Sequence, residues 1–215
     1  MNIIGMLISV VCRLIAITGH EVAHGFVSYK LGDPTPRREG RLSFNPMAHL
    51  DLMGTLLMLL TGFGWAKPVS VDPRYYRDTK KGMALVAIAG PLANLIMAFA
   101  GLLIYAIIFA INVKTGALSM LTSFLSEFSI SFAITNLSFM IFNLIPIPPL
   151  DGSRILGMFL SNSAYYKLLQ YERYSLFLIM VLSLSGAFSA IIGGGVSLIF
   201  SGIIDFLNML LRLVL

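Results

Sequence analysis

Long apolar segments constrain the fold of this chain more than any other feature of its sequence. They lie at about residues 2–31, 83–111, 118–145, 174–192 and 196–214. Most approach or exceed the roughly 20 residues with which a helix crosses a bilayer, and a helix satisfies its own backbone hydrogen bonds in lipid. Hydrophobic residues make up 57% of the chain and charged residues only 12%, which is unlike a soluble domain. We therefore expect an all-α polytopic membrane protein with about five to six transmembrane helices.

A shorter apolar segment, residues 51–63, is expected to be re-entrant, so that it enters the membrane and leaves it on the same side. Its 13 residues would span about 20 Å as a helix, which is less than a hydrocarbon core of about 30 Å. On either side, Arg41 to Phe44 and Trp65 to Asp72 alternate enough for short strands, although Pro68 restricts the second to a sheet edge or a loop. We expect a small β-hairpin or sheet near the cytoplasmic side.

The chain is expected to form one membrane-embedded domain, residues 1–215. Its motif-bearing core extends to about residue 155, and C-terminal helices occupy about 156–215. This length leaves no room for a PDZ-like or CBS-like module beside the helices. A turn is expected at Gly193 to Gly195, before the last helix.

The charge pattern and the cysteine count exclude several classes of partner and site. The formal charge of +5 comes from lysine and arginine gathered in loops beside apolar segments, as the positive-inside rule describes. We therefore expect no nucleic-acid partner. The single cysteine, Cys12, excludes an internal disulfide and a cysteine-based zinc site.

The clearest chemical signal is a run of five residues, His20 to His24, in the first apolar segment. It reads His-Glu-Val-Ala-His, so on a helix the two histidines project from one face and can hold one metal ion. Glu21 stands beside them, where a carboxylate can take a proton from water. Ionisable side chains are costly inside a bilayer, so three of them within one short run indicate a functional site.

Asp151 is a candidate third ligand if residues 51–63 do not cross the membrane. Basic residues flank that segment on both sides. If both clusters are cytoplasmic, the next apolar segment runs outward, and the following one returns to Asp151 on the side where His24 lies. If residues 51–63 crossed, Asp151 would lie on the opposite face. The alternative role for Asp151 is to cap a helix that begins near Ser153.

These motifs match a known family in type and in order. His20-Glu21-x-x-His24 followed by Asn143-x-x-Pro146-x-x-x-Leu150-Asp151-Gly152 resembles the site-2 proteases, which are intramembrane zinc metalloproteases. Further matches, typical of the compact bacterial and archaeal members, are Asn45-Pro46-x-x-His49-x-Asp51, Gly64-Trp65-Ala66-Lys67-Pro68-Val69 and Gly90-Pro91-x-x-Asn94. The resemblance covers roughly residues 15 to 155 by motif and the rest by hydropathy.

The resemblance implies an enzyme that hydrolyses peptide bonds in or near transmembrane segments of other membrane proteins. A prokaryotic cell membrane is also expected, and the re-entrant topology described above puts the active site toward the cytoplasmic side. His20, His24 and Asp151 would bind one Zn²⁺ per chain, with water in the fourth position and Glu21 as general base. Two imidazoles and one carboxylate suit this chemistry independently, because they leave an open position at which zinc lowers the pKa of water to about 7.

Other polar residues have two interpretations each. Asn143 is a candidate catalytic residue that stabilises an oxyanion or orients the substrate, and the alternative is a buried amide that joins two helices. His49 is expected to be a hydrogen-bonded structural residue rather than an occasional ligand. Gly90, Pro91 and Asn94 are expected to permit close helix approach and a bend rather than to act in catalysis.

Two other functions would use the same residues. A zinc transporter would favour further ionisable residues at successive membrane depths, whereas this chain concentrates its intramembrane polar groups at one level. A protein that binds transmembrane helices without cutting them would show the same motifs. The sequence therefore favours a zinc endopeptidase and leaves the non-proteolytic binder open.

Overall fold

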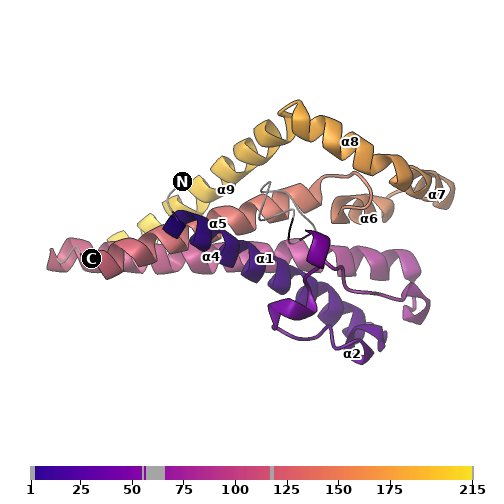
Figure 1. The fold of residues 1–215 in the computed structure, drawn as a ribbon, viewed down its shortest axis with the longest axis horizontal. Helices are drawn as coiled ribbons and strands as arrows, with labels where there is room; N and C mark the ends of the chain where they lie inside the picture. The colour runs from indigo at the N-terminus through magenta and orange to yellow at the C-terminus, as the bar shows by residue number, and fades with distance from the viewer. Residues whose placement is uncertain (1–2, 55, 57–65, 117–118, 215) are drawn as a thin grey trace.

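The computed structural model describes residues 3–54, 56, 66–116 and 119–214, and helices dominate this part of the chain (Figure 1). Four helices are long and apolar enough to cross a membrane: α1 (Ile3–Lys30), α4 (Thr79–Thr115), α5 (Met120–Leu144) and, within α9 (Ala187–Val214), the stretch Ala187–Leu211. The shorter helices are α2 (Thr35–Arg38), α6 (Asp151–Gly157), α7 (Asn162–Gln170) and α8 (Glu172–Leu184), with 3₁₀ turns η1 (Pro46–Ala48) and η2 (Pro73–Tyr75). The predicted helical membrane protein is confirmed. The described residues hold four candidate spans rather than five or six.

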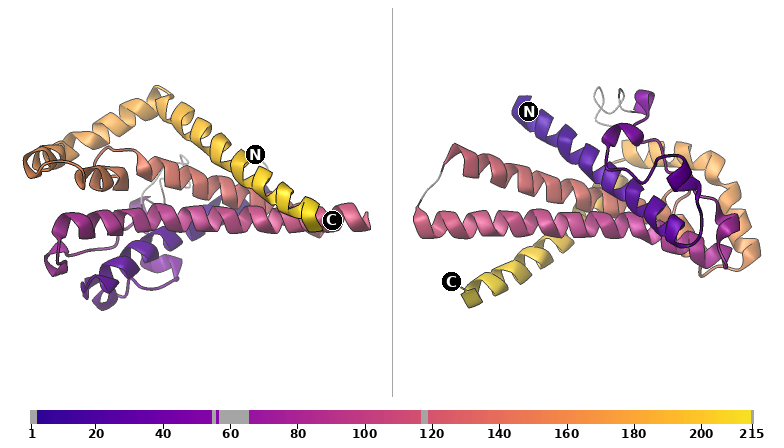
Figure 2. Two further views of the ribbon diagram at one scale, coloured as in Figure 1. Left: turned by 180° about the vertical axis from the view of Figure 1, so that it is seen from behind. Right: turned by 90° about the horizontal axis from the view of Figure 1, so that it is seen from below.

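Helices α4 and α5 run side by side along the long axis of the molecule, and α1 and α9 pack against this pair (Figures 1 and 2). Ala98 of α4 and Ala133 of α5 are buried where these helices meet, and Leu102 and Leu137 belong to the same cluster. Small side chains let helix backbones approach closely in lipid. Leu207 of α9 joins this cluster, so α9 covers part of the apolar surface of α4 and α5.

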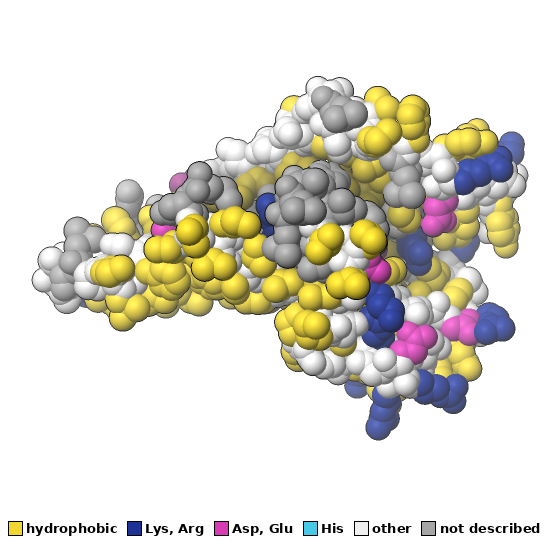
Figure 3. All heavy atoms as spheres, in the orientation of Figure 1, with side chains coloured by type: hydrophobic (Ala, Val, Ile, Leu, Met, Phe, Trp, Pro, Cys, Tyr) yellow, Lys and Arg dark blue, Asp and Glu magenta, His cyan; other side chains and the backbone are white. Residues whose placement is uncertain are grey.

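One buried carboxylate joins the end of α1 to the segment that precedes α4. Asp33 is fully buried, and it accepts hydrogen bonds from the Ser28 hydroxyl (2.7 Å) and the Asp72 backbone N–H (2.8 Å). The Thr35 backbone N–H also donates to it (2.9 Å). Ser28 shares a further 2.7 Å hydrogen bond with the Tyr76 hydroxyl. Lysine and arginine side chains gather at this end of the molecule, beyond the apolar flank of the long helices (Figure 3).

The described residues on either side of the segment 51–65 are neighbours, while 55 and 57–65 lie outside the described structure. Leu50 and Ala66 form an antiparallel bridge, and the Lys67 N–H donates to the His49 carbonyl oxygen (2.9 Å). The described residues on the two sides of this segment therefore lie next to each other. Most of the predicted re-entrant stretch, 51–63, lies outside the described residues, and its membrane depth stays a prediction.

The predicted β-hairpin is wrong for the residues that the structure describes. Residues 41–44 and 67–72 form no strand, and the bridge described above is isolated. Pro68 has no N–H to donate. The N–H of Val69 donates to the side chain of Glu21 (2.8 Å) instead of to a neighbouring strand. Two consecutive residues, Pro68 and Val69, therefore have no N–H available for a strand ladder.

The C-terminal helices divide at a different glycine from the one predicted. The chain turns at Gly186, where φ is +76°, while Gly193 to Gly195 lie inside α9. A positive φ suits glycine at the end of a helix, and helices in lipid tolerate glycine within them. A Cβ at Gly195 would lie 2.9 Å from the side chain of Ile141, so this glycine permits close approach of α9 to α5. Helix α8 has 13 residues, too few for a span.

Gly195→Val should loosen the packing of α9 on α5, because the added methyl groups would overlap Ile141. We expect the free energy of unfolding to fall by about 1–3 kcal/mol, as for overpacking elsewhere. Gly193→Val is the matched control, because a Cβ at Gly193 would meet no atom of another helix within 4 Å among the described residues. Circular dichroism during unfolding in detergent measures both variants, and equal stability would contradict the contact.

Asp33 should make the fold sensitive to acid. Burial alone would raise the pKa of this carboxyl, but hydrogen bonds from Thr35, Asp72 and Ser28 outweigh burial and lower it. A lowered folded pKa adds stability above the unfolded value of about 3.9, and that stability is lost as the pH falls through the folded pKa. Thermal unfolding from about pH 7 to about pH 3 should show this loss. Asp33→Asn should be less stable at neutral pH and less dependent on acid, and an unchanged acid profile would contradict the role.

Candidate metal centre

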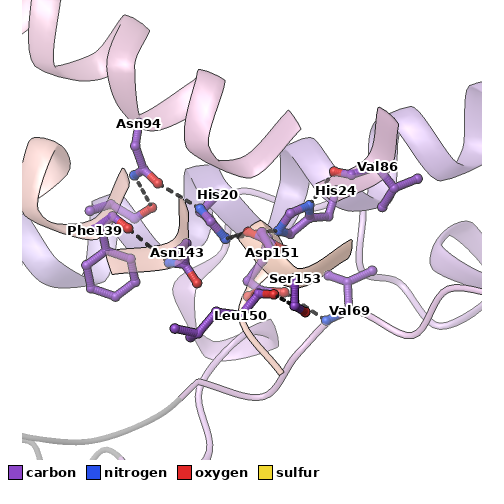
Figure 4. Close-up of polar contacts among 12 residues, drawn as sticks. His20, His24, Val69, Val86, Asn94, Phe139, Asn143, Leu150, Asp151 and Ser153 are labelled. Atoms are coloured by element: carbon purple, nitrogen blue, oxygen red, sulfur yellow. Dashed lines mark hydrogen bonds and ion pairs between the residues drawn. The ribbon is translucent and has the colours of Figure 1, made fainter. Parts of the chain in front are cut away.

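Three donor atoms from α1 and α6 converge inside the helix bundle (Figure 4). His20 and His24 lie one turn apart on α1, and Asp151 is the first residue of α6. His20 is 4% exposed, and the Oδ2 atom of Asp151 is buried and has no hydrogen-bond donor among the described residues. Within the described part of the chain, these side chains form a group whose geometry suits a metal ion.

A sharp break after α5 brings Asp151 back to the histidines. Helix α5 ends at Leu144, and the prolines between residues 146 and 149 cannot continue it. Gly152 then packs against the end of α5, where a Cβ would overlap the Leu144 carbonyl oxygen. Only glycine fits this approach without a backbone shift, which gives the Leu-Asp-Gly motif a local reason.

The three donor atoms are spaced like the ligands of one tetrahedral zinc ion. The Nε2 atoms of His20 and His24 are 2.9 Å apart, and Oδ2 of Asp151 lies 3.2 Å and 3.3 Å from them. Ligands about 2.0–2.1 Å from zinc at tetrahedral angles lie about 3.3 Å from one another. The residues present therefore fit zinc and leave a fourth tetrahedral position open.

Hydrogen bonds on the far side of each ring leave lone pairs on the converging nitrogens. The Nδ1 atom of His24 lies 2.7 Å from the Val86 carbonyl oxygen, which can only accept, so Nδ1 carries the hydrogen. The Nδ1 atom of His20 lies 2.7 Å from the side-chain oxygen of Asn94. In a neutral ring each Nε2 then bears a lone pair, and these lone pairs and the Asp151 carboxylate repel unless positive charge lies between them.

Helix α4 also supplies the space that the two rings occupy. A Cβ at Gly90 would lie 2.6 Å from Nε2 of His20 and 2.6 Å from Cε1 of His24. Gly90 thus permits the close approach that its sequence position indicates. Asn94 does more than its predicted packing role, because it binds the ring of His20 directly.

The carboxylate of Glu21 is held from outside its own helix. Its Oε2 atom accepts a 2.8 Å hydrogen bond from the backbone N–H of Val69, in the extended segment after the bridge. A carboxylate has about four lone-pair sites, so this bond leaves others free for water or a substrate. The predicted role of Glu21 as general base stays a prediction, with one oxygen fixed.

Two other predicted residues make contacts apart from the three donors. The Asn143 side chain donates to the Phe139 carbonyl oxygen of its own helix (3.0 Å), so this bond does not join two helices. His49 is fully buried, and its Nε2 lies 2.8 Å from the Ser43 carbonyl oxygen. His49 is thus a hydrogen-bonded buried residue, while the catalytic role of Asn143 stays a prediction.

Sequence reasoning missed Asn136, which reaches the site from α5. Its side-chain oxygen accepts a 2.9 Å hydrogen bond from Asn94, and both residues are fully buried. The signal available in the sequence was an amide in an apolar helix, because buried amides in lipid need partners.

Comparison with known proteins assigns the chain to a family. Residues 8–187 match Peptidase family M50. The chain belongs to this family. It is 39% identical over 173 residues to "Putative zinc metalloprotease YwhC" of Bacillus subtilis (strain 168), an alignment that covers 80% of this chain and 78% of that protein. It is 25% identical over 193 residues to "Putative zinc metalloprotease Rip2" of Mycolicibacterium smegmatis (strain ATCC 700084 / mc(2)155), covering 87% of this chain and 71% of that protein. No solved structure matches it.

Membership of this family confirms the resemblance to site-2 proteases that the motifs indicate. The chain is a zinc metalloprotease of the M50 type. The matched region includes the three converging donors and Glu21, so the family and the geometry concern the same part of the molecule.

Asp151→Ala should lower the zinc content of the purified protein to a small fraction of the wild-type value, because two imidazoles alone hold zinc weakly. Mass spectrometry of the metal content measures the ratio. Asp205→Ala, which removes an exposed aspartate of α9, is the matched control and should retain zinc. Full zinc content in the Asp151 variant would contradict the ligand assignment.

Proposed function

We propose that the protein is an intramembrane endopeptidase in which His20, His24 and Asp151 hold one zinc ion that serves to cleave transmembrane segments. The supporting observation is a three-donor group that includes two residues of α1, a helix long and apolar enough to cross a membrane. His24 lies six residues before the end of α1, or about 9 Å inside it. A substrate that reaches this depth is itself a membrane segment. Its helix must unwind locally, because helical amides are closed off by their own hydrogen bonds.

The proposed reaction needs one carboxylate in two roles. Zinc, when bound, lowers the pKa of a water molecule to about 7 and so supplies a nucleophile at neutral pH. Glu21 takes the proton from that water and then delivers it to the leaving amine. The peptide bond is hydrolysed without a covalent bond between enzyme and substrate. The Val69 N–H holds one oxygen of Glu21 during both transfers.

We propose that Asn143 contacts the substrate rather than the metal. One hydrogen of its amide is bonded to the Phe139 carbonyl oxygen, and among the described residues the second hydrogen and the amide oxygen have no partner, so they could bind a substrate backbone. Phe139 lies one turn earlier on α5, and its ring centroid is 6.2 Å from that of His20, so this face of α5 lies toward the site. A donor here would stabilise an oxyanion or orient the peptide.

The proposed orientation puts the site toward the cytoplasmic side of a prokaryotic cell membrane. Lysine and arginine cluster at the end of the bundle where α1 ends and α4 begins (Figure 3). Cytoplasmic loops carry such an excess in membrane proteins. The proposed partners are therefore single-span and other membrane proteins that present a transmembrane segment. We propose that residues 1–215 form one lipid-embedded domain.

Glu21→Gln should abolish cleavage while zinc remains bound. The amide keeps the size of the side chain but cannot take a proton, so we expect cleavage to slow by at least about 100-fold. The assay follows fragments of co-expressed single-span membrane proteins by mass spectrometry, with zinc content measured in parallel. Glu127→Gln, a change at an exposed acid of α5, is the control.

The outcomes separate the candidate functions. Unchanged cleavage by Glu21→Gln would overturn the proposed mechanism. Binding of a transmembrane peptide by the wild type without any cleavage would favour a non-proteolytic binder. Zinc uptake into sealed vesicles containing the wild type, without cleavage, would favour a transporter.

A further inference from the structure

Hydrogen bonds connect three buried polar side chains, one each from α1, α4 and α5, beginning at the proposed metal site. The Nδ1 atom of His20 lies 2.7 Å from Oδ1 of Asn94, and Nδ2 of Asn94 lies 2.9 Å from Oδ1 of Asn136. Both asparagines are fully buried, and His20 is 4% exposed. An unpaired amide at such a position would cost free energy, so these hydrogen-bond partners are required by the surroundings as well as by the site.

Backbone carbonyl oxygens that bind the two amides determine where the hydrogens lie in these hydrogen bonds. Nδ2 of Asn94 also donates to the Ala16 carbonyl oxygen (3.2 Å), and Nδ2 of Asn136 donates to the Phe132 carbonyl oxygen (2.9 Å). Carbonyl oxygens only accept, so each side-chain amide must turn its nitrogen toward the carbonyl oxygen that it contacts. Oδ1 of Asn94 is then left to accept from His20, which carries its hydrogen on Nδ1 and a lone pair on Nε2.

We propose that Asn94 and Asn136 are positioning residues that hold His20 in the tautomer and orientation that bind zinc. The proposal rests on the proposed metal site. Asn94 acts on the ring directly, and Asn136 acts through Asn94, whose amide it keeps from turning over. Loss of a partner that orients a metal-binding histidine weakens metal affinity by about 10–100-fold in other proteins.

Helix α5 supports the same ring with an aromatic side chain. Phe139 follows Asn136 by three residues, so both lie on one face of α5. Its ring meets that of His20 edge-on, at 72° between the planes. His20 is therefore held by side chains of α4 and α5 together, whereas the far side of His24 is held by a backbone carbonyl, that of Val86. This difference makes His20 the ligand whose orientation can be tested by mutation.

The same hydrogen bonds also join three helices, so the two asparagines could act in packing alone. A role in packing and a role in positioning His20 predict different effects on zinc affinity. If the amides only pack the helices, their loss lowers the stability of the metal-free protein and leaves zinc affinity unchanged. If they position His20, zinc affinity falls even in variants that remain folded. The experiment therefore measures the two quantities separately.

The first test compares two substitutions of Asn94 in the full chain, purified in detergent and freed of metal with a chelator. Zinc affinity is measured against a competing chromophoric chelator, and the visible spectrum of bound Co²⁺ reports tetrahedral ligation. Asn94→Leu should weaken zinc binding by about 10–100-fold. Asn94→Asp should bind zinc more tightly than Asn94→Leu, because a carboxylate still accepts from the His20 Nδ1–H, although it cannot donate to Ala16 or Asn136 as the amide does. Asn112→Leu, the same change near the far end of α4, should have no effect.

The second test asks whether Asn136 acts through Asn94. Asn136→Leu should weaken zinc binding by about threefold to tenfold in the wild-type background. It should cause no further loss in Asn94→Leu, because the two residues form one path to the ring. Additive losses in the double variant would overturn the role given to Asn136.

Each remaining outcome also decides between explanations. Equal zinc affinity of the wild type and Asn94→Leu, or an Asn94→Asp variant as weak as Asn94→Leu, would overturn the positioning role. Absence of zinc binding by the wild type would instead overturn the proposed function on which this role rests. If Asn94→Leu does not fold, Asn94→Ser replaces it, since the shorter side chain cannot reach His20. The thermal unfolding of each metal-free variant identifies a loss that comes from packing alone.

Discussion

Lipid offers no hydrogen bonds, and this constraint decides how the proposed metal site is built. The two histidines of α1 need protein partners at their Nδ1 atoms, and α4 provides both, from Val86 and Asn94. Gly90 lies between these two positions and leaves room for the rings. Residues 86, 90 and 94 are spaced by four, so they share one face of α4 and match the four-residue spacing of the histidines. The two histidines of the His-Glu-x-x-His motif on α1 are therefore matched by a set of residues with the same spacing on α4.

The same constraint links the positioning amide to the third ligand through α5. Asn136, Phe139 and Asn143 are three and four residues apart and lie along one face of that helix. The chain then breaks and begins α6 at Asp151. A shift of α5 along its axis would lengthen the Asn94–Asn136 hydrogen bond and move Asp151 in the same step. The position of the proposed ligand Asp151 and the packing of α5 would therefore change together.

The features predicted from sequence are those that depend on local spacing or on topology. Two histidines four residues apart share a helix face whatever surrounds them, and the side of the membrane follows from counting crossings. The bond between Asn94 and Asn136 depends instead on how α4 and α5 are rotated about their axes. Both helices are apolar around most of their surface, so the sequence shows little about that rotation. The strand predicted around Pro68 failed for a similar reason, because the neighbouring Val69 donates its N–H to the distant side chain of Glu21.

The helices that supply polar groups to the proposed site are α1, α4, α5 and α6. Helix α9 makes apolar packing contacts instead. The family match ends at residue 187, where α9 begins. Leu207 of α9 is buried against α4 and α5, and Gly195 brings α9 close to Ile141 of α5. These contacts are apolar, so any of several apolar sequences that keep a small residue at position 195 could make them. The proposed metal site constrains α1, α4, α5 and α6 through the geometry of their polar groups. Helix α9 is constrained mainly by the shape of the surface on which it packs.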